Sequence, residues 1–290
     1  MNCNPPMLNL NGILLDDWPP PLYDAQRALY YGDCLFETIR FFEGEAPLLP
    51  QHWARLSGAM RTWQYEVPTG WSAAFFEEEI RRVAPPNARV RLSVWRSPGG
   101  WYAPLHSSPH FLIAAQPLDC GQYEWLEEGL SVGLCRTVRL PTDGLSGWKG
   151  PNSPRYVAAA LEARDRGWQD ALLLNAADRV CEATSSNVAW IEGQCLYTPP
   201  LSEGPVTGVL RGLLPLLTER AGLRYAEQQA PPERLLQAEE LLLTNALRGI
   251  RWVRSCEGKA YACTQAARLH QALEEHISDM ISAQKAVRRL

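Results

Sequence analysis

The sequence predicts an α/β or α+β protein made of two domains, and three observations support this. Runs that alternate like strands and runs with a helical spacing of apolar residues follow one another along the chain. The 290 residues, 46% of them hydrophobic, suffice for two domains that each bury a core. Residues 117–123 have the pattern of a linker. We therefore expect one domain over residues 1–116 and a second over residues 124–290.

The first half is predicted to hold short strands and two helices. A strand over 8–15 contains the turn Asn11–Gly12, and three prolines at 19–21 make the next link irregular. The other elements expected here are a strand within 27–42 that a Gly32–Asp33 turn opens, a return strand that ends at 48–49, helices at 52–62 and 71–83, and strands at 89–95 and 111–115.

The second half includes a helix whose ends are marked by residue type. Asn152 can cap this helix, Pro154 suits its first turn because proline lacks an N–H that would have no partner there, and Gly167 ends it. The other elements expected here are strands at 130–138, 170–175, 179–182, 188–192, 195–198, 239–244 and 252–255, a helix that opens at Thr207–Gly208, and a helix at 264–277.

Composition argues against several classes of protein. The net charge is −4 and the arginines are scattered, which argues against nucleic acid or an anionic membrane as a partner. The first residues lack the pattern of a secretory leader and no apolar run is long enough to span a membrane, so we expect a cytoplasmic protein. The eight cysteines stand singly, which predicts neither a disulfide framework nor a metal site.

Lys149 stands out because the chain has so few lysines. The others are Lys259 and Lys285, so the 28 basic residues consist of three lysines and 25 arginines. Arginine can replace lysine in most surface roles, but only lysine has a primary amine that can lose its proton and react with a carbonyl. We interpret Lys149 as a candidate catalytic amine, and a solvated surface lysine is the alternative.

Two further features follow Lys149 in the order that a pyridoxal phosphate site needs. Glu182 ends a predicted strand and precedes the small polar residues 183–187, where polar groups can converge on a ligand. Gly208 opens a predicted helix, whose first N–H groups and dipole can hold a phosphate. An ordinary capped helix is the alternative for Gly208, so the order of the three features is more informative than any one of them.

A series of short motifs extends over nearly the whole chain. In order they are Tyr31-Gly32-Asp33, Phe36-Glu37-Thr38-Ile39-Arg40, His52-x-x-Arg55-Leu56, Lys149-x-x-Asn152, Ala171-Leu172-Leu173-Leu174-Asn175, Glu182-x-x-Ser185-Ser186-Asn187-Val188, Tyr197-Thr198-Pro199 and Gly208-Val209-Leu210-Arg211. In this order they resemble the class IV, fold type IV enzymes, which include branched-chain and D-amino acid aminotransferases and aminodeoxychorismate lyases. The resemblance implies a small N-terminal α/β domain and a larger, barrel-like C-terminal domain that binds pyridoxal 5′-phosphate.

The resemblance also implies roles for single residues. Lys149 would be the catalytic residue, Glu182 would face the pyridine nitrogen, and Arg55 would bind the phosphate with backbone N–H groups at the start of the helix. The full set of cofactor-binding residues that it implies is Arg55, Lys149, Glu182, Ser186, Asn187, Gly208, Val209, Leu210, Asn245 and Ala246.

The substrates implied by the resemblance are an amino acid and a 2-oxo acid. The substrate-binding residues that it implies are Tyr31, Phe36, Thr38, Arg40, Arg96 and Trp101. The loop over 96–106 would reach the site of a neighbouring subunit, so we expect a homodimer.

Several positions depart from the aminotransferases of the family. Leu210 and Ala246 stand where those enzymes usually carry a threonine, and both replacements look like the lyase. Against the lyase, Trp101 stands where lyases carry an arginine. Pro154 replaces a tyrosine of the branched-chain enzymes that bonds the cofactor O3′, and Arg155 or Tyr31 are the candidates to replace it.

Three functions are therefore compatible with the sequence. We favour an amino-acid aminotransferase with a mostly apolar pocket lined by Trp and Phe. The first alternative is 4-amino-4-deoxychorismate lyase, which uses the same lysine but releases pyruvate. The second is a relative without activity that binds the cofactor or nothing.

Overall fold

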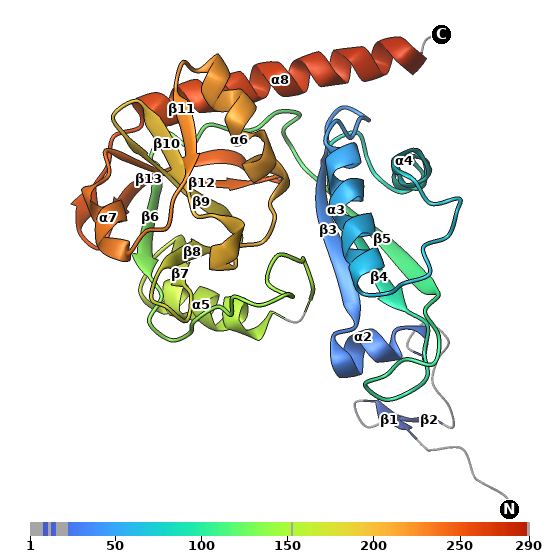
Figure 1. The fold of residues 1–290 in the computed structure, drawn as a ribbon. Coiled ribbons are helices and arrows are strands. Elements are labelled where there is room, and N and C mark those ends of the chain that lie inside the picture. Colours follow the sequence, from blue (N-terminus) through green and yellow to red (C-terminus); the bar gives the residue numbers. More distant parts are fainter. Residues whose placement is uncertain (1–7, 11–12, 16–22, 152, 289–290) are drawn as a thin grey trace, which may run out of the picture.

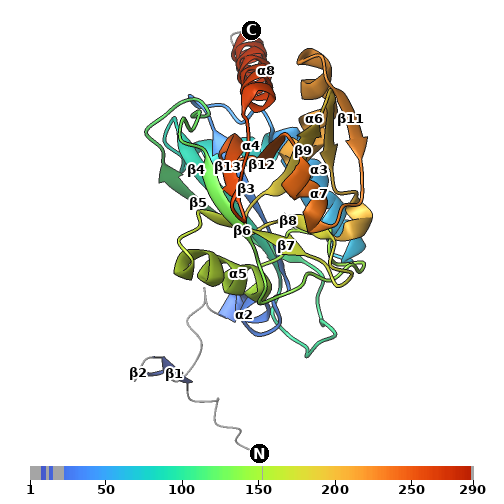
Figure 2. The same ribbon diagram turned by 90° about the vertical axis from the view of Figure 1, so that its left-hand side faces the viewer.

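The computed structural model describes residues 8–10, 13–15, 23–151 and 153–288. Within this part of the chain, a small sheet with its helices forms one half and a larger curved sheet forms the other (Figures 1 and 2). The turn predicted at Asn11–Gly12, the proline link at 19–21 and the predicted cap Asn152 lie outside the described residues.

The N-terminal half is built on a three-stranded antiparallel sheet of order β3-β4-β5. Its elements are β1 (Leu8–Leu10), β2 (Ile13–Leu15), α2 (Gln26–Tyr31), β3 (Cys34–Phe41), α3 (Leu49–Thr62), α4 (Ala73–Arg81), β4 (Ala88–Arg96) and β5 (Pro109–Pro117). Alternate residues of β4, from Val90 to Val94, are buried in a core to which α3 and α4 also contribute. The opposite face of β3 and β4 carries Phe36, Thr38, Arg89 and Arg91, and this face is turned to a cavity.

Two predictions for this half were wrong. Residues 27–31 belong to the helix α2 and not to a strand, and Gly32 ends that helix in a left-handed conformation with φ 64°. The expected return strand at 48–49 is the start of α3. Both segments are short and apolar, and over such a length the hydrophobic pattern alone does not separate a helix from a strand.

The C-terminal half is built on a sheet of order β11-β10-β9-β12-β13-β6-β7-β8, with β14 beside β13. Its elements are β6 (Leu130–Leu134), α5 (Pro154–Asp165), β7 (Asp170–Leu174), β8 (Val180–Ala183), β9 (Asn187–Glu192), β10 (Cys195–Thr198), the 3₁₀ turn η1 (Leu201–Glu203), α6 (Val209–Arg220), β11 (Arg224–Glu227), α7 (Pro232–Gln237), β12 (Glu240–Asn245), β13 (Gly249–Cys256), β14 (Lys259–Ala260) and α8 (Thr264–Arg288). Helices α6 and α8 share one core with strands β9 and β12. None of the helices in the described part of the chain combines the length and apolar character of a membrane span.

Arg40 joins the two halves. Its guanidinium donates hydrogen bonds to the carbonyls of Cys120, Gln122 and Leu247, at 2.8, 2.7 and 3.0 Å. The first two carbonyls belong to the segment 117–123 that the sequence predicts as a linker, and β5 ends at the beginning of this segment. The expectation that Arg40 binds substrate stays a prediction, and in this structure these donors are directed to backbone carbonyls. The division into two domains stays a prediction.

The end of α8 makes a second connection between the halves. Lys285 lies 2.6 Å from a carboxylate oxygen of Glu43, and Arg288 binds Glu45 and Glu77. Helix α8 begins in the core of the C-terminal half and its last turns lie beside the N-terminal half (Figure 1). These ion pairs and the bonds of Arg40 hold the two sheets on either side of the cavity.

Candidate active site

The two halves enclose a cavity of about 1280 Å³. The N-terminal half contributes one face of β3 and β4, and the C-terminal half contributes the end of β8, the turn after β12 and the start of α6. The segment that carries Lys149 lies between them, and its backbone is bonded to β3 by the Phe36 N–H, 2.9 Å from the Lys149 carbonyl oxygen. Residues far apart in the sequence therefore meet in one space.

The amine of Lys149 is shielded but has no direct partner. Nζ lies 4.7 Å from the centre of the Phe36 ring, and no hydrogen bond to Nζ is found within the described residues. Burial lowers the pKa of the Lys149 amine, and the nearby Arg55 guanidinium lowers it further. A larger fraction of the amine is therefore unprotonated than in solution, which is the form that reacts with a carbonyl.

Glu182 is the second ionisable group of the cavity, and it is only 3% exposed. Its carboxylate accepts hydrogen bonds from Tyr156 Oη at 2.5 Å, from Val206 N at 3.1 Å and from Asn187 Nδ2 at 3.2 Å. Burial raises the pKa of the Glu182 carboxyl to about 7, although these donors favour its ionised form. The carboxyl can therefore change its protonation near neutral pH.

Arg55 is held in place by Glu37, a residue that the sequence alone does not distinguish from any strand residue. Arg55 Nε lies 2.8 Å from Glu37 Oε1, Nη2 also binds this carboxylate, and Nη1 donates to the Thr207 carbonyl at 2.8 Å. His52 Nδ1 lies 2.6 Å from the same carboxylate. Burial alone would raise the pKa of Glu37, but Arg55 and His52 outweigh it and lower this pKa to about 2. The fixed carboxylate points Arg55 toward the start of α6.

The start of α6 has the features of an anion site. Its first residue follows Gly208, which has no side chain to cap the first N–H groups, and Gly208 and Val209 both line the cavity. A side-chain carbon at Gly208 would collide with Asn187 Oδ1. Free N–H groups at a helix start, with Arg55 beside them, suit a phosphate.

The turn after β12 closes the cavity next to Ser186. Asn245 Nδ2 donates to Ser186 Oγ at 2.9 Å, and Asn245 Oδ1 accepts from the N–H groups of Leu247 and Arg248. The Ala246 carbonyl accepts from Tyr123 Oη at 2.9 Å. Ser186, Asn187, Asn245 and Ala246 are thus brought together with Lys149 around one cavity, as are Tyr31, Phe36 and Thr38.

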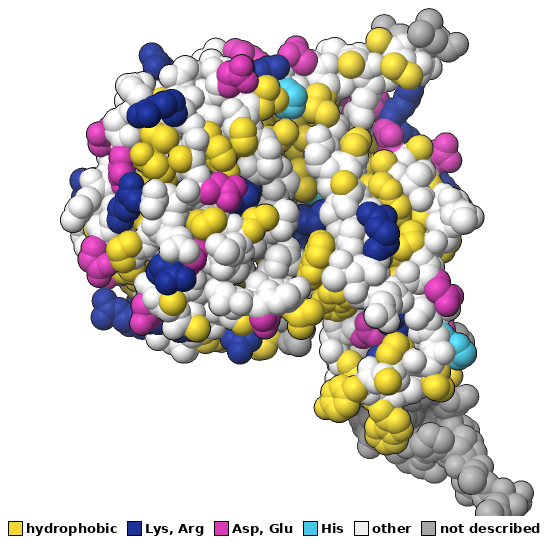
Figure 3. Space-filling model, in the orientation of Figure 1, with side chains coloured by type: hydrophobic (Ala, Val, Ile, Leu, Met, Phe, Trp, Pro, Cys, Tyr) yellow, Lys and Arg dark blue, Asp and Glu magenta, His cyan; other side chains and the backbone are white. Residues whose placement is uncertain are grey.

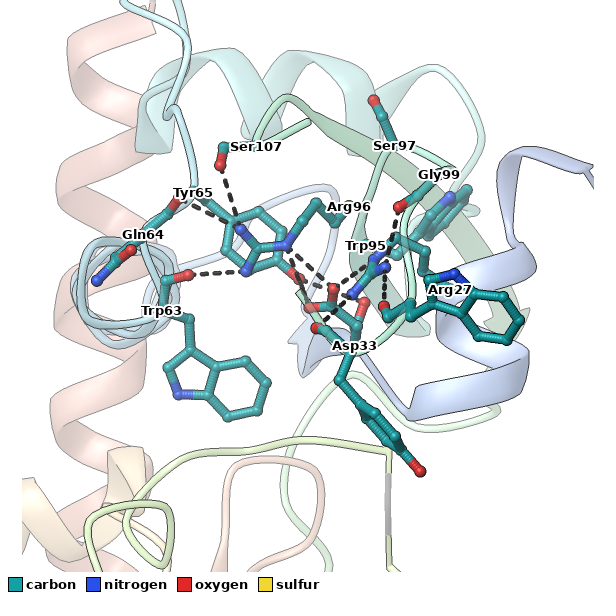
Figure 4. A network of polar contacts seen from close by, with 12 residues as sticks. Arg27, Asp33, Trp63, Gln64, Tyr65, Trp95, Arg96, Ser97, Gly99 and Ser107 are labelled. Atoms are coloured by element: carbon teal, nitrogen blue, oxygen red, sulfur yellow. Dashed lines mark hydrogen bonds and ion pairs between the residues drawn. The ribbon is translucent and has the colours of Figure 1, made fainter. Parts of the chain in front are cut away.

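Arg96 lines the cavity, but its guanidinium is already bound by the protein. Nε lies 3.0 Å from Asp33 Oδ2, and the other nitrogens donate to the carbonyls of Trp63 and Gln64 (Figure 4). Asp33 also binds Arg27, whose guanidinium reaches the carbonyls of residues 99, 101 and 102. The predicted contact of Arg96 with substrate stays a prediction, and in this structure its guanidinium is engaged by Asp33 and by backbone carbonyls.

Two other predicted residues have side chains outside this cavity. Leu210 is buried in the core between α6 and α8, so only its backbone N–H is available for the predicted contact with a phosphate. Trp101 is 84% exposed and does not line the cavity among the described residues. Its predicted contact with the substrate of a neighbouring subunit stays a prediction.

Sequence reasoning missed Tyr156 and Arg91. Tyr156 lies in the first turn of α5, and Arg91 lies on the cavity face of β4, where its guanidinium carbon is 3.7 Å from the centre of the Phe36 ring. The alternation of polar residues with the buried Val90, Leu92 and Val94 was a signal for Arg91. No comparable signal existed for Tyr156, because an aromatic residue in a first helical turn usually packs on the core.

The donor set of the cavity fits pyridoxal phosphate. A lysine amine, a carboxyl with a pKa near 7 and an uncapped helix start beside an arginine match its aldehyde, ring nitrogen and phosphate. Among the described residues, no three His, Cys, Asp or Glu side chains gather where a metal ion could bind.

Known proteins with similar sequences and structures fall into one family. Residues 34–256 match the family model for class IV amino-transferases. An aminodeoxychorismate lyase of Vibrio harveyi is 27% identical over 237 residues, 79% of this chain and 84% of that protein. The branched-chain-amino-acid aminotransferase of Escherichia coli is 26% identical over 249 residues, 80% of this chain and 78% of that protein.

A solved structure gives the same answer for the fold. An aminotransferase from Brucella abortus, bound to the cofactor pyridoxal phosphate, aligns over 91% of this chain and 97% of its own, with a TM-score of 0.76 at 23% identity. The predictions of the fold class and of a pyridoxal-phosphate-dependent enzyme are confirmed. The chain belongs to the class IV aminotransferase family.

Proposed function

We propose that the protein is an aminotransferase for which one substrate, an amino acid or a 2-oxo acid, carries a second carboxylate. The observation that carries this proposal is Arg91. Its guanidinium and the Lys149 amine both lie against the Phe36 ring, 3.7 and 4.7 Å from its centre. No hydrogen bond or carboxylate partner of this guanidinium is found within the described residues, so it is available to a ligand.

The charge of the whole cavity supports an anionic substrate. Its lining includes the carboxylates of Asp33, Asp143 and Glu182 against the cations of Arg27, Arg55, Arg89, Arg91, Arg96, Lys149, Arg155 and Arg248. Asp33 and Glu37 account for three of the arginines. Arg89, Arg91, Arg155 and Arg248 remain besides Lys149, and these four arginines outnumber the carboxylates of Asp143 and Glu182. The expectation of a mostly apolar pocket lined by Trp and Phe stays a prediction, and Phe36, Trp63 and Trp148 also line the cavity.

The residues around the cavity would divide the work of binding the cofactor. Lys149 would hold it covalently through Nζ, and Arg55 with the N–H groups of Val209 and Leu210 would bind its phosphate. Ser186, Asn187, Asn245 and Ala246 would form the surrounding wall. When bound, pyridoxal phosphate supplies a ring that accepts the electron pair left behind when a bond to the substrate α-carbon breaks.

Lys149 and Glu182 would handle the protons. Burial lowers the pKa of the Lys149 amine, so the amine can act as a base. It would take the proton from the substrate α-carbon and return it to the adjoining carbon of the cofactor. Glu182 would face the ring nitrogen of the cofactor, where its carboxylate would favour the protonated nitrogen. Phe36 keeps water away from the Lys149 amine, since its ring covers Nζ.

Aminodeoxychorismate lyase is the second candidate, and two observations favour it. Its substrate also carries two carboxylates, and the Arg91 guanidinium could bind one of them. Ala246 lines the cavity where aminotransferases of the family usually have threonine. The argument from Trp101 against the lyase is weaker than the sequence suggests, because Trp101 lies outside the cavity of its own chain.

We also propose that the protein works as a homodimer. Exposed apolar side chains gather on residues 23–29, which include the start of α2, and on the loop after β4. Both segments lie at the lower end of the N-terminal half (Figure 3). They include Tyr23, Leu29, Trp101, Tyr102 and Leu105, and Trp101 and Tyr102 are 84% and 88% exposed. A patch of this kind marks an interface, and the hydrogen bonds of Arg27 fix the loop in a defined shape.

Assays of amino transfer test the proposed reaction. The purified protein should transfer the amine of glutamate or another amino acid to a 2-oxo acid, and Lys149→Ala should abolish this turnover because the covalent anchor and proton carrier is lost. Lys259→Ala, which changes a lysine of the short strand β14, is the control and should keep wild-type rates. Release of pyruvate from aminodeoxychorismate without any 2-oxo acid, together with no transfer from L- or D-amino acids, would establish the lyase instead.

Arg91→Met tests the dicarboxylate specificity. Removal of a charged hydrogen-bond donor from a bound carboxylate costs about 2–3 kcal/mol, so KM for 2-oxoglutarate should rise roughly 30- to 150-fold while KM for a monocarboxylic 2-oxo acid changes little. Arg82→Met, which changes an exposed arginine directly after α4, is the matched control. An equal rise in KM for both acids contradicts the assignment.

The pH dependence of stability tests the burial of Glu182. Burial raises the pKa of Glu182 from 4.5 to about 7, so between these two pH values the folded protein binds a proton that the unfolded protein does not. The free energy of unfolding therefore falls as pH rises from 4.5 to about 7. In cofactor-free protein, Glu182→Gln and wild type should have the same free energy of unfolding near pH 4.5. Above pH 7 the free energy of unfolding of Glu182→Gln should be higher by on the order of 3 kcal/mol. Urea unfolding from pH 4.5 to 8 measures this difference, and a difference that stays constant with pH counts against the burial.

Sedimentation equilibrium tests the dimer. Wild-type protein should sediment at twice the 32.5 kDa of one chain, and Trp101→Glu should shift the mass toward the monomer because it places a charge in the apolar interface. Val83→Glu, which changes another exposed apolar residue, is the control and should remain dimeric. A monomeric wild type at micromolar concentration would refute the dimer.

A further inference from the structure

Tyr156 makes a direct contact with the carboxylate of the site. It lies in the first turn of α5, seven positions after Lys149, and its Oη donates to Glu182 Oε1 at 2.5 Å. Both side chains line the same cavity. Burial and the neighbouring Glu182 raise the pKa of the Tyr156 phenol, so the phenol keeps its proton and remains a donor.

The two carboxylate oxygens of Glu182 accept hydrogen bonds from different groups. Oε2 accepts from Asn187 Nδ2 and from Val206 N, both of which belong to the wall beneath the start of α6. Oε1 accepts from Tyr156 alone among the described residues. Loss of the phenol would therefore leave one buried carboxylate oxygen without a donor, which disfavours the ionised form.

Opposing influences set the protonation of Glu182, and burial outweighs the others. Burial favours the protonated carboxyl, whereas Tyr156, the Val206 N–H, Lys149 and Arg55 favour the ionised form. Cys181 precedes Glu182 on β8, and burial raises the pKa of its thiol, so this thiol adds no charge at neutral pH. With a midpoint of about 7, the loss of one donor changes the ionised fraction at neutral pH substantially.

We infer that Tyr156 is a positioning residue that keeps Glu182 ionised and aims its carboxylate across the cavity. Helix α5 begins five positions after Lys149, and Lys149, Tyr156 and Glu182 all line the same cavity. The consequence for catalysis rests on the proposed function, in which Glu182 serves the ring nitrogen of the cofactor. The consequence for the protonation of Glu182 does not, because it concerns the protein alone.

The experiment is an NMR titration of cofactor-free protein that carries glutamate labelled with ¹³C at the side-chain carboxyl. Glu182→Gln identifies the Glu182 signal as the one that disappears. Tyr156→Phe fills the same space without the hydroxyl and should raise the midpoint of Glu182 by about one to two pH units, since a charged hydrogen bond is lost. Tyr65→Phe removes a comparable phenol from Asp33 in the other half of the protein and should leave this midpoint unchanged.

Measurements on the loaded enzyme give the second readout. Tyr156→Phe should lower kcat at neutral pH and shift the pH profile of kcat, while its dissociation constant for pyridoxal phosphate remains within about threefold of the value for Tyr65→Phe. An unchanged Glu182 midpoint in folded Tyr156→Phe protein overturns the inference. If the midpoint is unchanged but the pH dependence of the cofactor absorbance shifts, the phenol acts on the cofactor and not on Glu182. The two proposals can fail separately. If wild-type protein shows no amino transfer but Tyr156→Phe still shifts the Glu182 midpoint, the proposed function is contradicted and the role of Tyr156 stands.

Discussion

Lys149 and Glu182 are shielded from water in one cavity without a bond to each other, and much of the surrounding structure maintains this arrangement. Removing a charged group from water costs several kcal/mol unless partners replace the lost hydration. Glu182 receives three hydrogen bonds, yet burial still raises its pKa to about 7. The Lys149 amine lies over the Phe36 ring and makes no hydrogen bond within the described part of the chain. A cavity with two such groups is stabilised by a ligand that presents a carbonyl to one and a basic nitrogen to the other.

The position of these groups depends on how the two halves are joined. Lys149 is tied to β3 through the Phe36 N–H, whereas Glu182 belongs to the sheet of the C-terminal half. Arg55 reaches across the cavity from α3 to the Thr207 carbonyl, and Glu37 and His52 fix it from behind. The bonds of Arg40 add a link from β3 to the turn after β12. A shift of one half against the other would separate Arg55 and the start of α6 from Lys149.

Much of this fold and site could be predicted from the sequence, because local patterns and ordered motifs determine them. The helices α3 and α5 and most strands of both sheets follow apolar spacing and helix-end residues, whereas β11, α7 and β14 were not predicted. Several residues that line the cavity, among them Ser186, Asn187 and Gly208, belong to the motifs of the sequence. The roles of Arg40, Arg96 and Glu37 could not be predicted, because a charged residue on a strand or helix has the same local pattern whether it faces a ligand or a protein partner. Only the three-dimensional structure shows that Asp33, Glu37 and backbone carbonyls engage these side chains.

The scarcity of lysine makes the central claim directly measurable. Borohydride reduction of the protein loaded with pyridoxal phosphate fixes any bond between the cofactor and a lysine, and peptide mass mapping then identifies which of Lys149, Lys259 and Lys285 carries it. We expect the added mass on the peptide that contains Lys149 and on no other. Added mass on Lys259 or Lys285 alone, or no added mass at saturating cofactor, would contradict the assignment of Lys149 as the catalytic residue.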